Sequence, residues 1–316
     1  MTPVDSIQAG YVGSVGRHIE AFPGTNNPSQ ILPPGTPITP YLAFPDFANG
    51  ASYDTTAGSS SYNSLQTKYE RRFSHGLNLL AGYTWARTLS DAGDLLSDGG
   101  VGGYRAPQIT GISYDRGLAS FNINHSFVAS GTYNLPIGKG KAFLSDLHGP
   151  AQLLLGGWLA NGILTLNSGP PQYIPCQITT TATTGTCYAN VVPGVSKYRS
   201  GGPAHYYNPA AFTDPPVATT IGNSNLAPLG GSNTQLNGPG YRDLDFSIFK
   251  EFGITDTTRL QFRAEAFNLT NTPSFNLPSN NNFQDTLNFG QSTTTRNSGL
   301  NTGNQRQIQF ALKYYW

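Results

Sequence analysis

Five histidines are the residues of this chain best suited by type to metal binding or proton transfer. They lie far apart, at His18, His75, His125, His148 and His205. None forms the closely spaced pair that a metal site on one element needs. The chain also contains no Gly-x-Ser-x-Gly sequence that would present a nucleophilic serine. We therefore expect no enzymatic activity, no cofactor and no metal site.

Cys176 and Cys187 are the only cysteines, and a threonine-rich segment separates them. Two cysteines without neighbouring histidines make a poor metal site. The remaining interpretations are a disulfide and a pair of unreactive thiols. An exported location favours the disulfide, because oxidising compartments preserve such bonds.

Seven charged residues recur at alternating positions within otherwise apolar segments. They are Lys68, Glu70, Arg72, Asp243, Asp245, Arg263 and Glu265. Alternation places such residues on one face of a β-strand. Cross-strand ion pairing and hydration of a water-filled interior are the main interpretation, and a role in a substrate path is the alternative.

The composition indicates which kind of structure must position these charges. Charged residues make up 11% of the 316 residues, against about 25% in typical soluble domains. Mean hydropathy is nevertheless −0.31, because Gly, Tyr, Phe and uncharged polar residues replace the missing charge. The longest apolar stretch, 151–166, is interrupted by glycine and asparagine and is short for a membrane helix. A wall with one face in lipid and one in water fits this composition, and the net charge of +1 gives no reason to expect a nucleic-acid partner.

Eight segments show the two-residue hydrophobic period of amphipathic strands. They span residues 6–19, 61–73, 76–88, 120–134, 152–168, 241–252, 258–270 and 304–316. In 258–270, for example, Leu260, Phe262 and Ala264 alternate with Arg263 and Glu265. A slip of one residue would place charges in lipid at roughly 2–4 kcal/mol for a midplane arginine, so the register is strongly specified.

The connections between these segments alternate in length. Those at 20–60, 89–119, 169–240 and 271–303 are long, whereas those near 74–75, 138–140 and 253–257 are shorter. Long loops at one edge and short turns at the other are typical of bacterial outer-membrane β-barrels, whose long loops lie outside the cell. The sequence therefore predicts an all-β, antiparallel transmembrane barrel wall, a partial barrel of about eight strands. An even number of strands places both chain ends on the periplasmic side.

The final segment ends in an alternating aromatic and aliphatic row. Its members are Ile308, Phe310, Leu312, Tyr314 and Trp316. Such an ending resembles the signal by which the barrel-assembly machinery recognises its substrates. An amphipathic last strand presents an open row of backbone N–H and C=O groups with which another sheet can pair. Any amphipathic strand at a chain end is the simpler alternative.

Several segments together resemble the C-terminal barrel portion of Oar-like TonB-dependent receptors. In chain order they are Gly10–His18, Tyr62–Lys68, Gly82–Ala86, Asp115–Ser130, Leu135–Pro136, Gly156–Gly162 and Arg263–Pro273, of which the last is the most specific. The resemblance implies uptake of an unidentified ligand across the outer membrane. It also implies a larger parent, with a signal peptide, a plug domain and about 22 strands.

None of the signal peptide, the plug or the N-terminal barrel strands is recognisable in residues 1–316. We therefore expect this chain to be the C-terminal part of a barrel, with outer-membrane lipid, the assembly machinery, and the N-terminal barrel and plug (through which TonB would act) as partners. A structural or adhesive surface protein is the first alternative, and a secreted β-sandwich binding module the second.

The hairpin over residues 241–270 allows a specific prediction of register. A turn centred near residue 254 places Asp245 opposite Arg263, an attractive pair worth roughly 0.2–1 kcal/mol. A centre one residue later places Asp245 opposite Glu265, which is less favourable. We therefore expect Asp245 beside Arg263, with both side chains on the polar face.

Overall fold

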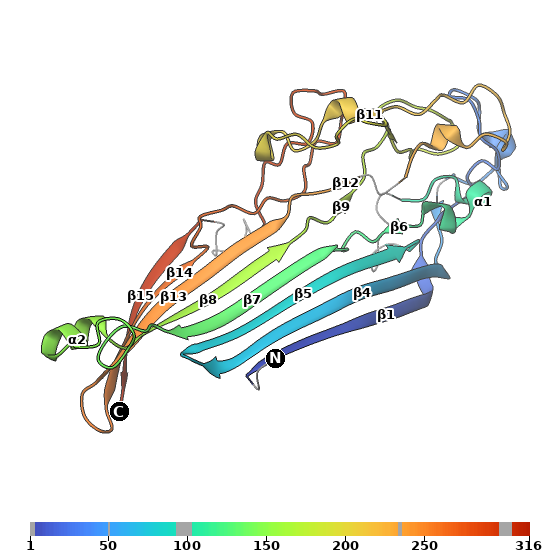
Figure 1. Cartoon of the computed structure of the whole chain (residues 1–316). Helices are drawn as coiled ribbons and strands as arrows, with labels where there is room; N and C mark the ends of the chain where they lie inside the picture. Colours follow the sequence, from blue (N-terminus) through green and yellow to red (C-terminus); the bar gives the residue numbers. More distant parts are fainter. Residues whose placement is uncertain (1–3, 50, 93–102, 233–235, 297–304) are drawn as a thin grey trace.

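The structure is a computed structural model that describes residues 4–49, 51–92, 103–232, 236–296 and 305–316. One antiparallel sheet dominates it (Figure 1). Its eight main strands are β1 (Asp5–Ala21), β4 (Thr55–Ser74), β5 (Leu77–Ser90), β7 (His125–Asn134), β8 (Trp158–Asn167), β13 (Tyr241–Gly253), β14 (Arg259–Phe267) and β15 (Gln307–Tyr315). Each pairs with the next in this order, so the predicted antiparallel β architecture is confirmed.

The shorter elements lie in the connections. They are β2 (Gly24–Thr25), β3 (Ala51–Ser52), β6 (Gly117–Leu118), β9 (Pro171–Gln172), β10 (Asn190–Val191), β11 (Phe212–Thr213), β12 (Leu236–Asn237), the helices α1 (Pro107–Thr110) and α2 (Gly149–Leu155), and five 3-10 turns at Thr39–Tyr41, Ile112–Asp115, Gly202–Ala204, Pro209–Ala211 and Ala227–Leu229. No helix in the described ranges is long and apolar enough to cross a membrane.

The sheet is curved and open, with β1 and β15 as its edges among the described strands (Figure 1). The four long connections gather at one end, and the N- and C-terminal ends of the chain lie at the other. Hence the predicted sorting of connections is present. The exception is the β7–β8 connection, which covers residues 135–157 and includes α2.

Two predicted strands begin at least five residues later in the structure than in the sequence pattern. In the segment 152–168, residues up to Leu155 belong to α2 and the strand starts at Trp158. The proline and the apolar run at the start of α2 suit a helix, and Gly157 then adopts a φ of 74° that ends it. In the segment 120–134 the strand starts at His125, because the preceding residues turn to bond with the end of β5.

The alternation of apolar and polar residues persists across the whole sheet. Directly paired residues of antiparallel strands share a face. One such row runs from Phe310 through Ala264, Ile248, Ala160 and Tyr133. We call the side that this row occupies the apolar face and the other side the polar face.

The predicted register of the 241–270 hairpin is wrong. Phe249, not Asp245, lies opposite Arg263, and Ser247 lies opposite Glu265. The turn is centred on Asp256 because Thr258 closes a five-residue loop. Moving the centre by two residues moves every partner by four, which is an even number. Asp245 and Arg263 therefore still share the polar face.

Two cations occupy the apolar face near the short turns. Arg71 lies 3.7 Å from the Asp5 carboxylate on the neighbouring strand. Lys250 is buried beneath α2, where its ammonium group donates to the Gly156 carbonyl and lies 5.8 Å from the Trp158 ring centre. Both charges therefore have partners within the protein.

Candidate functional site

The polar face carries all seven charged residues that the sequence singled out, because each has the parity of that face in the strand register. They do not form one cluster. Lys68, Glu70 and Arg72 lie on β4, whereas the other four lie on β13 and β14. Strands β5, β7 and β8 separate the two groups.

Within the β4 group, Glu70 joins two cations. The Lys68 ammonium lies 2.9 Å from one of its carboxylate oxygens, and the Arg72 guanidinium lies 3.9 Å from the other. These pairs are exposed, so solvent screens them and they contribute little to stability. They hydrate and neutralise the wall more than they stabilise it.

The second group is spread along β13 and β14. Arg263 lies 3.7 Å from Glu265 and stacks over the Phe249 ring at 5.3 Å. Asp245 accepts a hydrogen bond of 3.0 Å from the backbone N–H of Asn268, where β14 ends. The hydroxyl group of Tyr241 donates to Asp243 at 3.2 Å. The charges of this group therefore have local partners, as a structural wall requires.

The terminal row lies on the exposed outer edge of the sheet. β15 pairs with β14 on one side only, and its apolar side chains are more than half exposed: Ile308 59%, Phe310 71%, Leu312 65%, Tyr314 53% and Trp316 90%. The Phe310 ring stacks on Phe262 with centres 6.3 Å apart. An edge of this kind can accept another strand, and its role in assembly remains a prediction.

Above the sheet, the four long connections fold together into a unit that we call the loop cap: residues 22–54, 91–124, 168–240 and 268–306, where described. Two buried apolar clusters form its cores. The larger consists of Ile174, Ala189, Tyr207, Ala211, Phe212, Leu236, Phe283 and Phe289, and the smaller of Ile31, Ala106, Ala218 and Leu229. Each cluster draws residues from more than one connection, so the loops stabilise one another.

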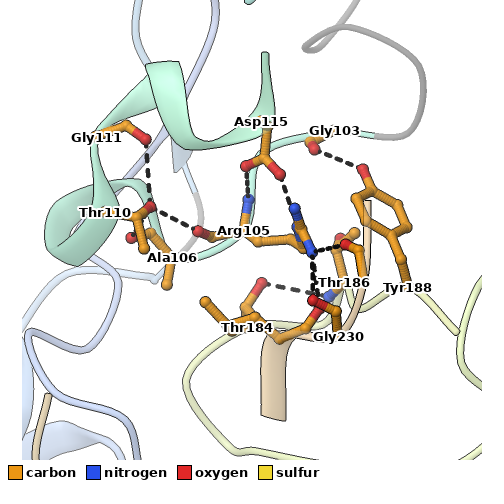
Figure 2. A network of polar contacts seen from close by, with 12 residues as sticks. Gly103, Arg105, Ala106, Thr110, Gly111, Asp115, Thr184, Thr186, Tyr188 and Gly230 are labelled. Carbon is orange, nitrogen blue, oxygen red and sulfur yellow. Dashed lines mark hydrogen bonds and ion pairs between the residues drawn. The ribbon is translucent and has the colours of Figure 1, made fainter. Parts of the chain in front are cut away.

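A buried ion pair ties the second connection of the cap to the third (Figure 2). The Arg105 guanidinium lies 2.6 Å from the Asp115 carboxylate, with side-chain exposures of 4% and 1%. Arg105 also donates to the carbonyls of Leu229 at 2.9 Å and Gly231 at 2.6 Å. Its guanidinium lies over the Tyr188 ring at 4.3 Å.

Burial is the main influence on the Asp115 carboxyl and raises its pKa, while the Arg105 charge and its hydrogen bonds oppose that rise. Desolvation therefore offsets much of the attraction between the two groups. The pair stabilises the cap mainly by holding one loop against another. One side chain fixes the positions of two carbonyls on another loop.

The structure joins Cys176 to Cys187 by a disulfide within the third connection. Their Cα atoms are 5.5 Å apart, inside the usual range for disulfides of about 4.4–6.8 Å. Beside the bond, the backbone N–H of Ala189 donates to the Ile174 carbonyl at 2.9 Å. The disulfide therefore closes a short hairpin next to the larger cap core.

Two cavities open in the upper part of the molecule. The first, about 820 Å³, lies in the first connection and is lined by uncharged residues, among them Asn27, Gln30, Tyr41 and Tyr53. The second, about 520 Å³, lies where β5 extends beyond the start of β7 and is lined by Trp85, Arg87, Leu118, His125 and others. Neither holds a group of three or more histidine, cysteine or acidic side chains suited to a metal, and the described residues contain no such group elsewhere.

The comparison with protein families agrees with this geometry. Residues 3–309 match the family model described as "Outer membrane beta barrel domain". The chain belongs to the outer-membrane β-barrel domain family. No curated protein matches it significantly. In such barrels the apolar face of the strands lies in lipid, which accounts for the low charge and the alternation of this chain.

Sequence reasoning located the polar-face charges of this barrel domain but missed the loop cap. The periodic patterns that reveal strands are absent from the connections. Arg105 and Asp115 gave no signal by spacing, because the residues they contact come from another loop. The apolar residues of the larger core, such as Phe283 and Phe289, stand singly among Asn, Gly and Pro. The one local sign of a buried core in these connections was the presence of isolated aromatic residues among polar ones.

Proposed function

We propose that this chain is part of the wall of a TonB-dependent-receptor-like transporter that takes up a ligand across the outer membrane. The observation that carries the proposal is the polar face, whose charged groups line a wall of membrane-spanning strands. A barrel interior needs such groups only if water or a polar solute occupies it. The loop cap lies over the end of this wall where the long connections gather, so a ligand arriving from that side would meet it first.

In this proposal the short turns and both chain ends are periplasmic, and the loop cap is extracellular. Lys68, Glu70, Arg72, Asp243, Asp245, Arg263 and Glu265 then face the lumen. The protein acts without catalysis or a cofactor. Coupling to TonB would act through a plug and further strands belonging to the complete transporter. The barrel-assembly machinery would insert the protein by way of the β15 edge.

The experiment compares cells with and without the complete protein in a medium of mixed solutes. Mass spectrometry of the medium should show a solute whose depletion requires both the protein and the proton-motive force. The Asp243→Asn/Asp245→Asn variant removes two of the lumen charges and leaves the apolar face intact, so it should assemble normally and deplete the solute more slowly. Unchanged solute levels with normal assembly of the protein would contradict the transport proposal.

An adhesive or structural surface role is the second candidate, favoured by the cap itself. Its cores give it a defined surface, which carries exposed apolar side chains such as Leu287 (77%) and Phe47 (71%). Exposed apolar residues at such a surface can contact a partner. In the same cells, this role predicts attachment to surfaces or other cells without depletion of any solute.

A further inference from the structure

Charge is unevenly distributed between the two ends of the apolar face. At the short-turn end, Arg71 and Lys250 have partners within the protein, as described above. Between the ends, the apolar-face positions of the described strands carry no charged side chain. At the loop end, five arginines outnumber two acids: Arg17, Arg87, Arg116, Arg242 and Arg306 stand beside Glu20 and Asp91. We call these seven residues the loop-side rim.

One of the two acids of the rim, Asp91, is already neutralised. Asp91 is nearly buried, with its side chain 6% exposed, and the Arg116 guanidinium lies 3.5 Å from its carboxylate. Arg116 also donates to the Ser61 hydroxyl at 2.9 Å, which anchors it to the apolar face of β4. Arg116 therefore has a structural role, and the other four rim arginines outnumber the one remaining acid, Glu20.

Three of those arginines, Arg17, Arg87 and Arg242, are exposed and lie on β1, β5 and β13. None has a carboxylate partner among the described residues. Exposed guanidinium groups at the edge of an apolar surface suit phosphate, because their planar N–H groups match its oxygens.

The 520 Å³ cavity provides a concave site within this rim. Arg87, Trp85 and His125 reach it from the apolar face, and His125 stacks on Tyr83 with a hydrogen bond of 2.8 Å between the ring nitrogen and the hydroxyl. Aromatic residues at this level are typical of the interface between lipid tails and headgroups. The cavity is large enough for a phosphorylated sugar headgroup.

We infer that the loop-side rim binds the phosphorylated headgroup of an outer-leaflet glycolipid, whose acyl chains lie on the apolar strands below it. The inference rests on the proposed function for one point, the extracellular orientation of the loops. A phosphate group alone would satisfy the arginines, but only an amphiphile would also cover the apolar strands between the two ends.

The test measures binding of fluorescent diphosphoryl lipid A to the complete protein in a neutral detergent. Each interfacial arginine contributes about a fivefold change in affinity. The Arg87→Gln/Arg242→Gln variant should therefore bind roughly 25-fold more weakly. Arg72→Gln is the matched control, because its side chain is 79% exposed but lies on the polar face. It should bind lipid A as the unaltered protein does.

Inorganic phosphate and phosphatidylethanolamine serve as competitors. The inference predicts that neither displaces lipid A at equal concentration. Displacement by phosphate would show a free-anion site and overturn the lipid assignment, and equal binding by both variants would overturn the rim. Heat-modifiable gel mobility verifies that each variant is folded, and Arg17→Gln provides an independent test if the double variant fails to assemble. Loss of lipid binding with unchanged solute uptake would separate this inference from the transport proposal.

Discussion

Breaking the Arg105–Asp115 pair is expected to open the loop cap while leaving the sheet intact. Removing one member of a buried ion pair costs about 3–5 kcal/mol, because the other charge stays buried without its partner. In Asp115→Asn the guanidinium of Arg105 keeps its carbonyl acceptors on the neighbouring loop and its contact with Tyr188. This variant should therefore destabilise the closed cap by about 3 kcal/mol.

In Arg105→Gln the carboxylate loses its cation and the carbonyls of Leu229 and Gly231 lose a charged donor. That variant should destabilise the closed cap by about 5 kcal/mol. Since about 1.4 kcal/mol is tenfold, the open fraction of the cap should rise roughly 100-fold in the first variant and several thousandfold in the second. The matched double variant, Arg105→Met/Asp115→Leu, should be milder than Arg105→Gln, because no buried charge remains.

Hydrogen exchange of the detergent-solubilised protein measures these changes. Backbone amides of residues 103–118 and 226–232 should exchange faster in both single variants, whereas amides in β4 and β5 should be unaffected and serve as the internal control. Equal exchange in the cap of all variants would show that the pair does not hold the loops together. Acceleration across the whole sheet would show instead that cap and sheet unfold as one unit.

Three further outcomes are expected. Replacing both cysteines, Cys176→Ser/Cys187→Ser, should destabilise the cap locally by about 2–3 kcal/mol. Hydrogen exchange in the cap at the same rate as in the unaltered protein would argue against a structural role of the disulfide. Phe310→Asp or deletion of Trp316 should lower the amount of protein assembled in the membrane several-fold, as judged by heat-modifiable mobility, whereas Gln309→Asn on the other face of β15 should have little effect. In a cysteine-free background, Ser247→Cys/Glu265→Cys should cross-link readily and Asp245→Cys/Arg263→Cys poorly; the reverse order would restore the register predicted from sequence.

The sheet was predictable because lipid imposes a two-residue period on every spanning strand. That period placed Arg263 and Glu265 on the polar face and Phe310 on the other. A shift of the cross-strand partner by an even number of residues leaves every side chain on the same face. The period therefore could not determine the partner of Asp245. The centre of the turn depended on hydrogen bonds of Thr255 and Thr258 that the pattern does not contain.

Strand starts failed where a second signal competed with the period. The run Gln152–Leu155 is apolar enough for a strand, yet Pro150 precedes it and Gly156 follows it, which also suits a short helix. The cap was beyond reach for a different reason. Its stability comes from contacts between loops far apart in the chain, and no local pattern records which loops will meet.

The separation in sequence between cap partners has a consequence for the order of folding. Each sheet strand pairs with its successor among the main strands, so hairpins can form as the chain is delivered. By contrast, the Leu32 amide bonds to Thr183 across 151 residues and Arg105 bonds to Gly231 across 126. Contacts of such long range form slowly, because a large loop must close first. The cap can therefore form fully only after the strands between its loops are in place. A completed cap then indicates that this wall has been inserted correctly.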